Sequence, residues 1–227
     1  EALINGGIDI LELGIPFSDP IADGPTIQQA TTRALKSGTT PRVVLEIAGT
    51  IVRKHDVPLV ILTYYNIIYK MGLRNFFDIA EKSGVNGIIV PDLTVEESTD
   101  YKRIAEDYNV DTIFLAAPSS SDERLEKIIN QSSGFLYLVS LFGVTGARED
   151  LGDQSVDFIK RAVSTAQGRI RLAVGFGVSN PVHVRRIISS GADAAIVGSG
   201  FVRIIEKNLT EKEGMLKEMR NHAHRLK

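Results

Sequence analysis

A glutamate lies at the centre of an apolar, strand-like segment near the start of the chain. Residues 9–15 read D-I-L-E-L-G-I, with Glu12 in the middle, and such a run is typical of a parallel strand covered on both faces. A buried carboxyl group either finds a partner or raises its pKa until it is neutral. The neutral form is the one that a general acid needs near neutral pH. We therefore predict that Glu12 is a catalytic acid/base; the alternative is an exposed strand end with Glu12 paired to a lysine.

A second carboxylate, Asp23, lies in the loop that follows this segment. Three prolines stiffen the loop, because each fixes its own φ and restricts the residue before it: Pro16, Pro20 and Pro25. A rigid loop can hold an aspartate over the end of a strand, so Asp23 is a candidate functional residue. The alternative is that Asp23 or Asp19 only makes a turn with the backbone that follows it.

Three glycine-containing loops follow three consecutive strand-like segments. They read G-V-T-G at 143–146, G-F-G-V at 175–178 and V-G-S-G at 197–200. Glycine lets the backbone approach a phosphate closely, and the N–H groups at a helix N-terminus attract an anion. Each loop alone is equally well explained as a tight turn. Together, at consecutive strand ends, they predict a phosphate site.

Short β-rich segments alternate with helix-like segments along the whole chain. We predict seven strands, at 9–15, 58–64, 86–91, 111–116, 135–140, 170–176 and 193–198. Regular alternation of strands and helices indicates a parallel sheet.

Capping residues mark several of the predicted helices. Thr40 and Asn180 each precede a proline, which is the pattern of an N-cap followed by proline at the first helical position. Residues 94–97, T-V-E-E, predict a capping box, and Gly84 and Gly191 stand where helix C-caps belong.

The predicted fold is an α/β barrel of the (β/α)8 type, formed by residues 1–227 as a single domain. Such a barrel needs eight strands, whereas the sequence predicts seven, and residues 1–7 look like the end of a helix. We expect the first βα unit, of roughly 35 residues, to lie upstream. An open doubly wound sheet is the alternative.

Composition narrows the class of protein. The 227 residues are 43% hydrophobic and 24% charged, with a formal net charge of -2, so nothing favours a nucleic acid or a membrane surface as partner. The chain has no cysteine, which excludes disulfides and thiolate chemistry and favours the cytoplasm. The four histidines show no metal-ligand spacing, and we predict that they are surface residues: His55, His183, His222 and His224.

With these residues assembled, the chain resembles the α subunit of tryptophan synthase over essentially its whole length. The most specific matching segment is L-E-L-G-I-P-F-S-D-P-I-A-D-G-P-T-I-Q at 11–28. Further matches are I-I-V-P-D-L-T-V-E-E-S at 88–98, F-L-Y-L-V-S-L-F-G-V-T-G-A at 135–147, G-F-G-V-S at 175–179 and I-V-G-S-G at 196–200. The last two also occur in other phosphate-binding barrels.

The resemblance implies a lyase of tryptophan biosynthesis. In that family, indole-3-glycerol phosphate is cleaved to indole and glyceraldehyde 3-phosphate by a retro-aldol reaction that needs no cofactor and no metal. Glu12 matches the principal acid/base, Asp23 the acid at the indole nitrogen, and Tyr137 the tyrosine beside the glutamate. The phosphate-holding and loop residues match Thr145, Gly146, Gly177, Gly198 and Ser199. Ile27, Leu62 and Phe176 would supply apolar contacts to the indole ring, although as core residues they need no such role.

The resemblance also implies a partner, the β subunit, in an α2β2 complex in which pyridoxal phosphate belongs to the β subunit only. Two alternatives remain at this point. One is another phosphate-binding barrel isomerase or lyase, although no lysine of the kind that indole-glycerol-phosphate synthase chemistry would need stands at a predicted strand end. The other is a non-catalytic barrel that acts as an allosteric partner, for which a carboxylate inside an apolar strand would serve no purpose.

Overall fold

The computed structural model describes residues 1–140 and 153–227, and these divide into two compact units. The first unit contains Glu1 and Leu3–Phe114, and the second contains Ala2 and Leu115–Lys227. Each unit is built on its own parallel sheet. No helix within the described residues is long and apolar enough to cross a membrane.

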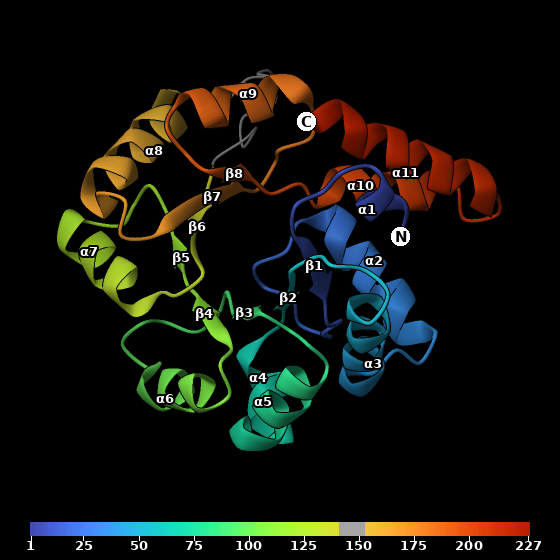
Figure 1. Ribbon diagram of the computed structural model, residues 1–227, viewed down its shortest axis with the longest axis horizontal. Coiled ribbons are helices and arrows are strands. Elements are labelled where there is room, and N and C mark those ends of the chain that lie inside the picture. Colours follow the sequence, from blue (N-terminus) through green and yellow to red (C-terminus); the bar gives the residue numbers. More distant parts are fainter. Residues whose placement is uncertain (141–152) are drawn as a thin grey trace. The chain divides into compact units, whose positions relative to one another are not determined.

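The first unit carries a parallel sheet with the strand order β1-β2-β3-β4. Its strands are β1 (Leu11–Gly14), β2 (Leu59–Leu62), β3 (Gly87–Ile89) and β4 (Asp111–Ile113). The helices are the short α1 (Ala2–Asn5) at the start of the chain, then α2 (Pro25–Lys36), α3 (Pro41–Val52), α4 (Tyr65–Met71), α5 (Leu73–Lys82) and α6 (Thr99–Asp107). Figure 1 shows α3, α4 and α6 along the same side of these strands.

The second unit repeats this plan with the strand order β5-β6-β7-β8. Its strands are β5 (Leu115–Ala116), β6 (Phe135–Val139), β7 (Arg171–Gly175) and β8 (Ala194–Ala195). Its helices are α7 (Asp122–Gln131), α8 (Asp153–Ala166), α9 (Pro181–Ser189), α10 (Ser199–Lys207) and α11 (Lys212–Leu226). In Figure 1, α7, α8 and α9 follow one another along one side of the strands.

The strands predicted from the sequence are all present, and every strand pair in the described residues is parallel as expected. The prediction of one continuous strand at 111–116 was wrong. That segment is interrupted at the buried Phe114, which separates β4 from β5, and the two pieces belong to different sheets.

The pairing of β1 with β2 shows which face of the first sheet carries Glu12. Glu12 pairs with Val60, and two residues further along Gly14 pairs with Leu62. Because side chains alternate along a strand, Glu12, Val60 and Leu62 share one face. The opposite face carries Leu11 and Ile61, which are 7% and 0% exposed.

Two of the predicted helix starts are confirmed by hydrogen bonds. The Thr40 side chain accepts a bond of 3.3 Å from the Val43 N–H at the start of α3. The Asn180 side chain accepts a bond of 2.9 Å from the His183 N–H at the start of α9. In both cases a proline occupies the first turn, where its missing N–H costs nothing.

The predicted capping box at Thr94 and Glu97 was wrong. The Glu97 N–H donates to the Thr94 carbonyl, and the Ser98 hydroxyl donates to the Val95 carbonyl at 3.0 Å. These bonds close a turn, so α6 begins only at Thr99.

Two glycines at helix C-termini provide a matched test of crowding. Gly84 follows α5 with φ +71°, and a Cβ placed there would lie 2.8 Å from Cγ1 of Val52. Gly38 follows α2 with φ +80°, and a Cβ there would meet no atom within 4 Å. Gly38→Ala should lose about 1–2 kcal/mol of unfolding free energy through backbone strain alone.

Gly84→Ala should lose this amount and about 1–3 kcal/mol more, because the new methyl group overpacks against Val52. Urea unfolding of both variants measures the difference. Equal losses in the two variants would contradict the packing described here.

Candidate active site

Glu12 is the central titratable group of the first unit. It lies in β1 and is half-buried. Burial and, to a smaller extent, the negative charge of Asp23 together raise the pKa of its carboxyl group from 4.5 to about 7. At neutral pH a substantial fraction of Glu12 is therefore protonated, so it can give or take a proton in the range where a general acid/base is most effective.

Asp23 is held by the loop between β1 and α2. Its N–H donates to the Pro20 carbonyl at 3.0 Å, and its own carbonyl accepts from the Gln28 side chain at 2.9 Å. Its carboxylate accepts a 3.1 Å hydrogen bond from the hydroxyl of Tyr64. Burial raises the pKa of Asp23, and the bond from Tyr64 partly offsets this effect.

Tyr64 is a contributor to the site that the sequence did not reveal. It follows β2, is 2% exposed, and its hydroxyl also accepts a 3.0 Å hydrogen bond from the Ala22 N–H. Its ring stacks on Phe17 with the centroids 5.2 Å apart. The hydroxyl thus fixes both the loop backbone and the Asp23 carboxylate. The only sequence signal was a tyrosine at the end of the strand predicted at 58–64.

Two carboxyl groups with different surroundings therefore lie near one another in the first unit. Glu12 is half-buried in a strand, whereas Asp23 lies in a loop and accepts a hydrogen bond from Tyr64. Neighbouring acids with different environments can divide acid and base roles between them. The predicted apolar residues of this unit are both half-buried: Leu62 on the face of Glu12 and Ile27 in the first turn of α2.

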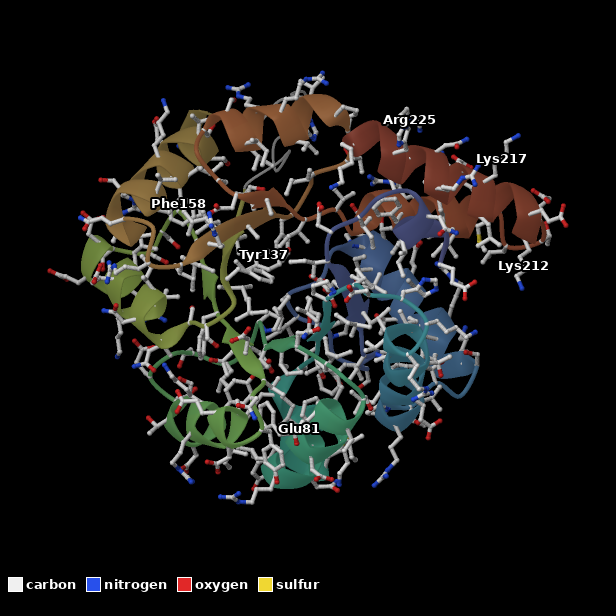
Figure 2. The ribbon with its side chains drawn as sticks, in the orientation of Figure 1. Glu81, Tyr137, Phe158, Lys212, Lys217 and Arg225 are labelled. Carbon is white, nitrogen blue, oxygen red and sulfur yellow. The ribbon has the colours of Figure 1, made fainter. Side chains whose placement is uncertain are left out.

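Tyr137 belongs to the second unit and lies in β6, where it is 5% exposed. Its ring meets that of Phe176 edge to face, with the centroids 5.8 Å apart. A Cβ at Gly175 would overlap the Tyr137 hydroxyl, so only glycine leaves room for the ring. Figure 2 shows Tyr137 on the opposite side of the strands from Phe158 of α8.

Two of the predicted glycine turns of the second unit lie within the described residues. Phe176 and Gly177 both have positive φ, +69° and +80°. Gly198 precedes Ser199, the first residue of α10, and a Cβ at Gly198 would meet no protein atom within 4 Å. The space above Gly198 is thus free, and the N-terminus of α10 attracts an anion, although the Phe201 N–H already donates to the Gly198 carbonyl at 3.1 Å. Thr145 and Gly146 lie outside the described residues.

One prediction about the histidines was wrong. His183 is not a surface residue: it is 6% exposed. Its Nδ1 accepts a 3.4 Å hydrogen bond from the Ser179 N–H, and its Nε2 lies 3.1 Å from the Asn180 side-chain nitrogen. Within residues 1–140 and 153–227, no group of three or more histidine, aspartate or glutamate side chains is arranged to hold a metal ion.

The sequence of residues 1–227 matches a known protein family, which is described as tryptophan synthase alpha chain. This chain belongs to the tryptophan synthase alpha chain family. The α chain of Methanoregula boonei is 46% identical over 227 residues, which cover 100% of this chain and 85% of that protein. The α chain of Methanocaldococcus jannaschii is 49% identical over 211 residues, covering 92% and 74% of the two chains.

Solved structures agree with this assignment of the α chain. A chain of the tryptophan synthase α2β2 complex from Pyrococcus furiosus has a TM-score of 0.92 at 42% identity, covering 99% of this chain and 88% of that one. A second structure of the complex from the same organism gives a TM-score of 0.90 at 40% identity, with the same coverage. The fold class is therefore the α/β barrel predicted from the sequence.

The raised pKa of Glu12 predicts a specific pH dependence of stability. Between about 4.5, the ordinary pKa, and about 7, the folded protein binds more protons than the unfolded chain. The contribution of Glu12 to the unfolding free energy of the wild-type protein therefore falls as the pH rises through that window. Glu12→Gln cannot ionise, so its stability relative to wild type should rise from pH 4.5 to 7 and stay level above that.

Urea unfolding at pH 4.5, 6 and 8 measures this difference. Glu126→Gln is the control, because Arg169 lowers the pKa of Glu126 below 4.5, so its difference in stability from wild type should stay level between pH 6 and 8. A Glu12→Gln difference that does not change with pH would contradict the burial of the Glu12 carboxyl group.

Tyr64→Phe tests the support of Asp23. Loss of the hydroxyl removes a bond that lowers the pKa of Asp23, so that pKa should rise further. Tyr69→Phe, at a ring that is 65% exposed on α4, is the matched control and should leave Asp23 unchanged. NMR titration of the Asp23 carboxyl carbon measures both, and an identical titration in Tyr64→Phe and wild type would refute the role of Tyr64.

Proposed function

We propose that this chain cleaves indole-3-glycerol phosphate to indole and glyceraldehyde 3-phosphate by a retro-aldol reaction, as the α subunit of tryptophan synthase. Membership of the family makes it a lyase of tryptophan biosynthesis. The observation that carries the proposed reaction is the half-buried Glu12, whose pKa of about 7 suits it to both proton donation and proton removal.

Three proton movements are needed to break the bond between indole C3 and the glycerol carbon. A proton is delivered to C3, the indole N–H proton is lost during this protonation and returns to the nitrogen as the bond breaks, and a proton is removed from the side-chain hydroxyl. We assign the C3 and hydroxyl protons to Glu12, because its pKa allows both protonation states near neutral pH. We assign the indole nitrogen to Asp23, which Tyr64 orients by a hydrogen bond.

The remaining predicted residues are assigned to binding. Gly177, Gly198 and Ser199 would hold the phosphate through backbone N–H groups, and the open space above Gly198 supports this. We assign Thr145 and Gly146 to the phosphate-holding and loop roles that the family resemblance implies. Tyr137 would line the site, and the apolar contacts to indole would come from Ile27, Leu62 and Phe176. We propose, as the sequence predicts, that residues 1–227 work as a single domain.

The proposed partner is the tryptophan synthase β subunit. The Pyrococcus furiosus relative forms an α2β2 complex whose subunits activate one another, and we propose the same assembly for this chain. Pyridoxal phosphate would belong to the β subunit alone, with no cofactor in this chain. Direct transfer of indole between subunits has a physical rationale, since indole is apolar and would otherwise escape through membranes. We place the reaction in the cytoplasm.

Indole release from indole-3-glycerol phosphate, with and without a β subunit, tests the proposal. Glu12→Gln should lower kcat by at least about a hundredfold, the typical loss for a positioned acid/base group. Glu126→Gln, an ion-paired surface glutamate, is the control and should keep full activity. Full activity of Glu12→Gln would refute the assignment, and a wild-type chain inactive in both conditions would favour a non-catalytic partner.

Gly198→Val tests the phosphate end. A Cβ at this position would meet no atom within 4 Å outside the two neighbouring residues, so the fold should persist while the valine side chain occupies the space above the turn. KM should rise by about tenfold, equal to about 1.4 kcal/mol of binding, with kcat less affected. Gly198→Ala should give a smaller change in the same direction. Steady-state kinetics measure both, and an unaltered KM in Gly198→Val would count against phosphate binding at this turn.

A further inference from the structure

The turn after β7 has a backbone conformation that needs support. Phe176 has φ +69° and Gly177 has φ +80°. A phenylalanine rarely adopts the left-handed region, because its Cβ approaches the following carbonyl oxygen. The conformation therefore persists only where surrounding groups impose it.

Ser140 supplies that support from the end of the neighbouring strand β6. It is 4% exposed, and its N–H donates to the Gly175 carbonyl at 3.0 Å. Its hydroxyl lies within hydrogen-bond distance of two successive carbonyls, that of Gly175 and, at 2.7 Å, that of Phe176. One buried hydroxyl thus reaches both peptide groups that flank the Phe176 Cα.

The direction of the Gly177 N–H follows from this bond. The Phe176 carbonyl and the Gly177 N–H belong to one planar trans peptide group and point in opposite directions. Fixing the carbonyl toward Ser140 therefore fixes the N–H in the same plane, pointing away from Ser140. The same two peptide groups also set the Phe176 ring against Tyr137, with the centroids 5.8 Å apart.

The far end of the turn is held separately. The Ser179 N–H donates to the buried His183 ring at 3.4 Å, and Asn180 caps α9. This second anchor is two residues beyond Gly177, so it fixes where the chain leaves the turn. Within the described residues, the Ser140 hydroxyl is the side-chain group bonded to the Phe176 carbonyl.

We infer that Ser140 is a positioning residue for phosphate recognition: its hydroxyl fixes the peptide group that presents the Gly177 N–H to the substrate phosphate. This inference rests on the proposed function. Ser140 does not touch the reacting atoms, so its loss should weaken recognition of the phosphate more than it slows proton transfer at Glu12.

The test compares two aldehydes in the reverse reaction with indole. Wild type should condense indole with glyceraldehyde 3-phosphate far better than with glyceraldehyde, which lacks the phosphate. Ser140→Ala should lower the ratio of the two kcat/KM values by about tenfold, equal to about 1.4 kcal/mol. Ser140→Thr keeps the hydroxyl and should restore most of the ratio.

Ser132→Ala is the matched control. Its hydroxyl donates to the Ile128 carbonyl at 2.8 Å at the end of α7, in the same unit, so the chemical change is equivalent. This variant should keep the wild-type ratio. A solely structural role of Ser140 would lower kcat/KM for both aldehydes equally.

An unchanged ratio in folded Ser140→Ala, or a loss in Ser140→Thr as large as in Ser140→Ala, would overturn the inference. If Ser140→Ala does not fold, Ser140→Cys replaces it, since a thiol of similar shape is a much weaker donor. A wild-type ratio in Ser140→Cys would then overturn the inference. Failure of wild type with both aldehydes would instead overturn the proposed function, and with it this inference.

Discussion

Burial of the Glu12 carboxyl group is the constraint on which the rest of the first unit depends. A half-buried carboxyl beside the negative charge of Asp23 is easier to protonate than one in water, and its pKa rises from 4.5 to about 7. This destabilises the folded protein above that pH. A strand of purely apolar residues would avoid the cost, so retaining an ionisable group in β1 makes sense where proton transfer requires it.

The surroundings of Asp23 show how such a group is kept in place. The loop from β1 to α2 is stiffened by prolines, yet stiffness alone does not orient a side chain. The Tyr64 hydroxyl does so by donating to Asp23 and accepting from Ala22 at the same time. In the second unit, Ser140 plays a comparable part by reaching two carbonyls of the turn after β7. Both supporting groups are buried hydroxyls just beyond strand ends.

The sequence predicted much of the fold because its signals are local. Apolar runs bounded by turn residues predicted the strands, and Thr40 and Asn180 predicted helix starts through bonds to residues three positions away. The supporting hydroxyls escaped prediction for the opposite reason. Tyr64 meets Asp23 across 41 residues, and Ser140 meets Phe176 across 36. Nothing in the neighbouring sequence marks such contacts, since a tyrosine or serine after a strand is common without them.

The pKa of the Glu12 carboxyl group in the folded protein tests this account most directly. NMR titration of the labelled carboxyl carbon should give an apparent pKa of about 7 in wild type. In Asp23→Asn it should be lower, because the charge of Asp23 is the second cause of the shift after burial. A wild-type value near 4.5, the ordinary pKa of glutamate, would contradict the account.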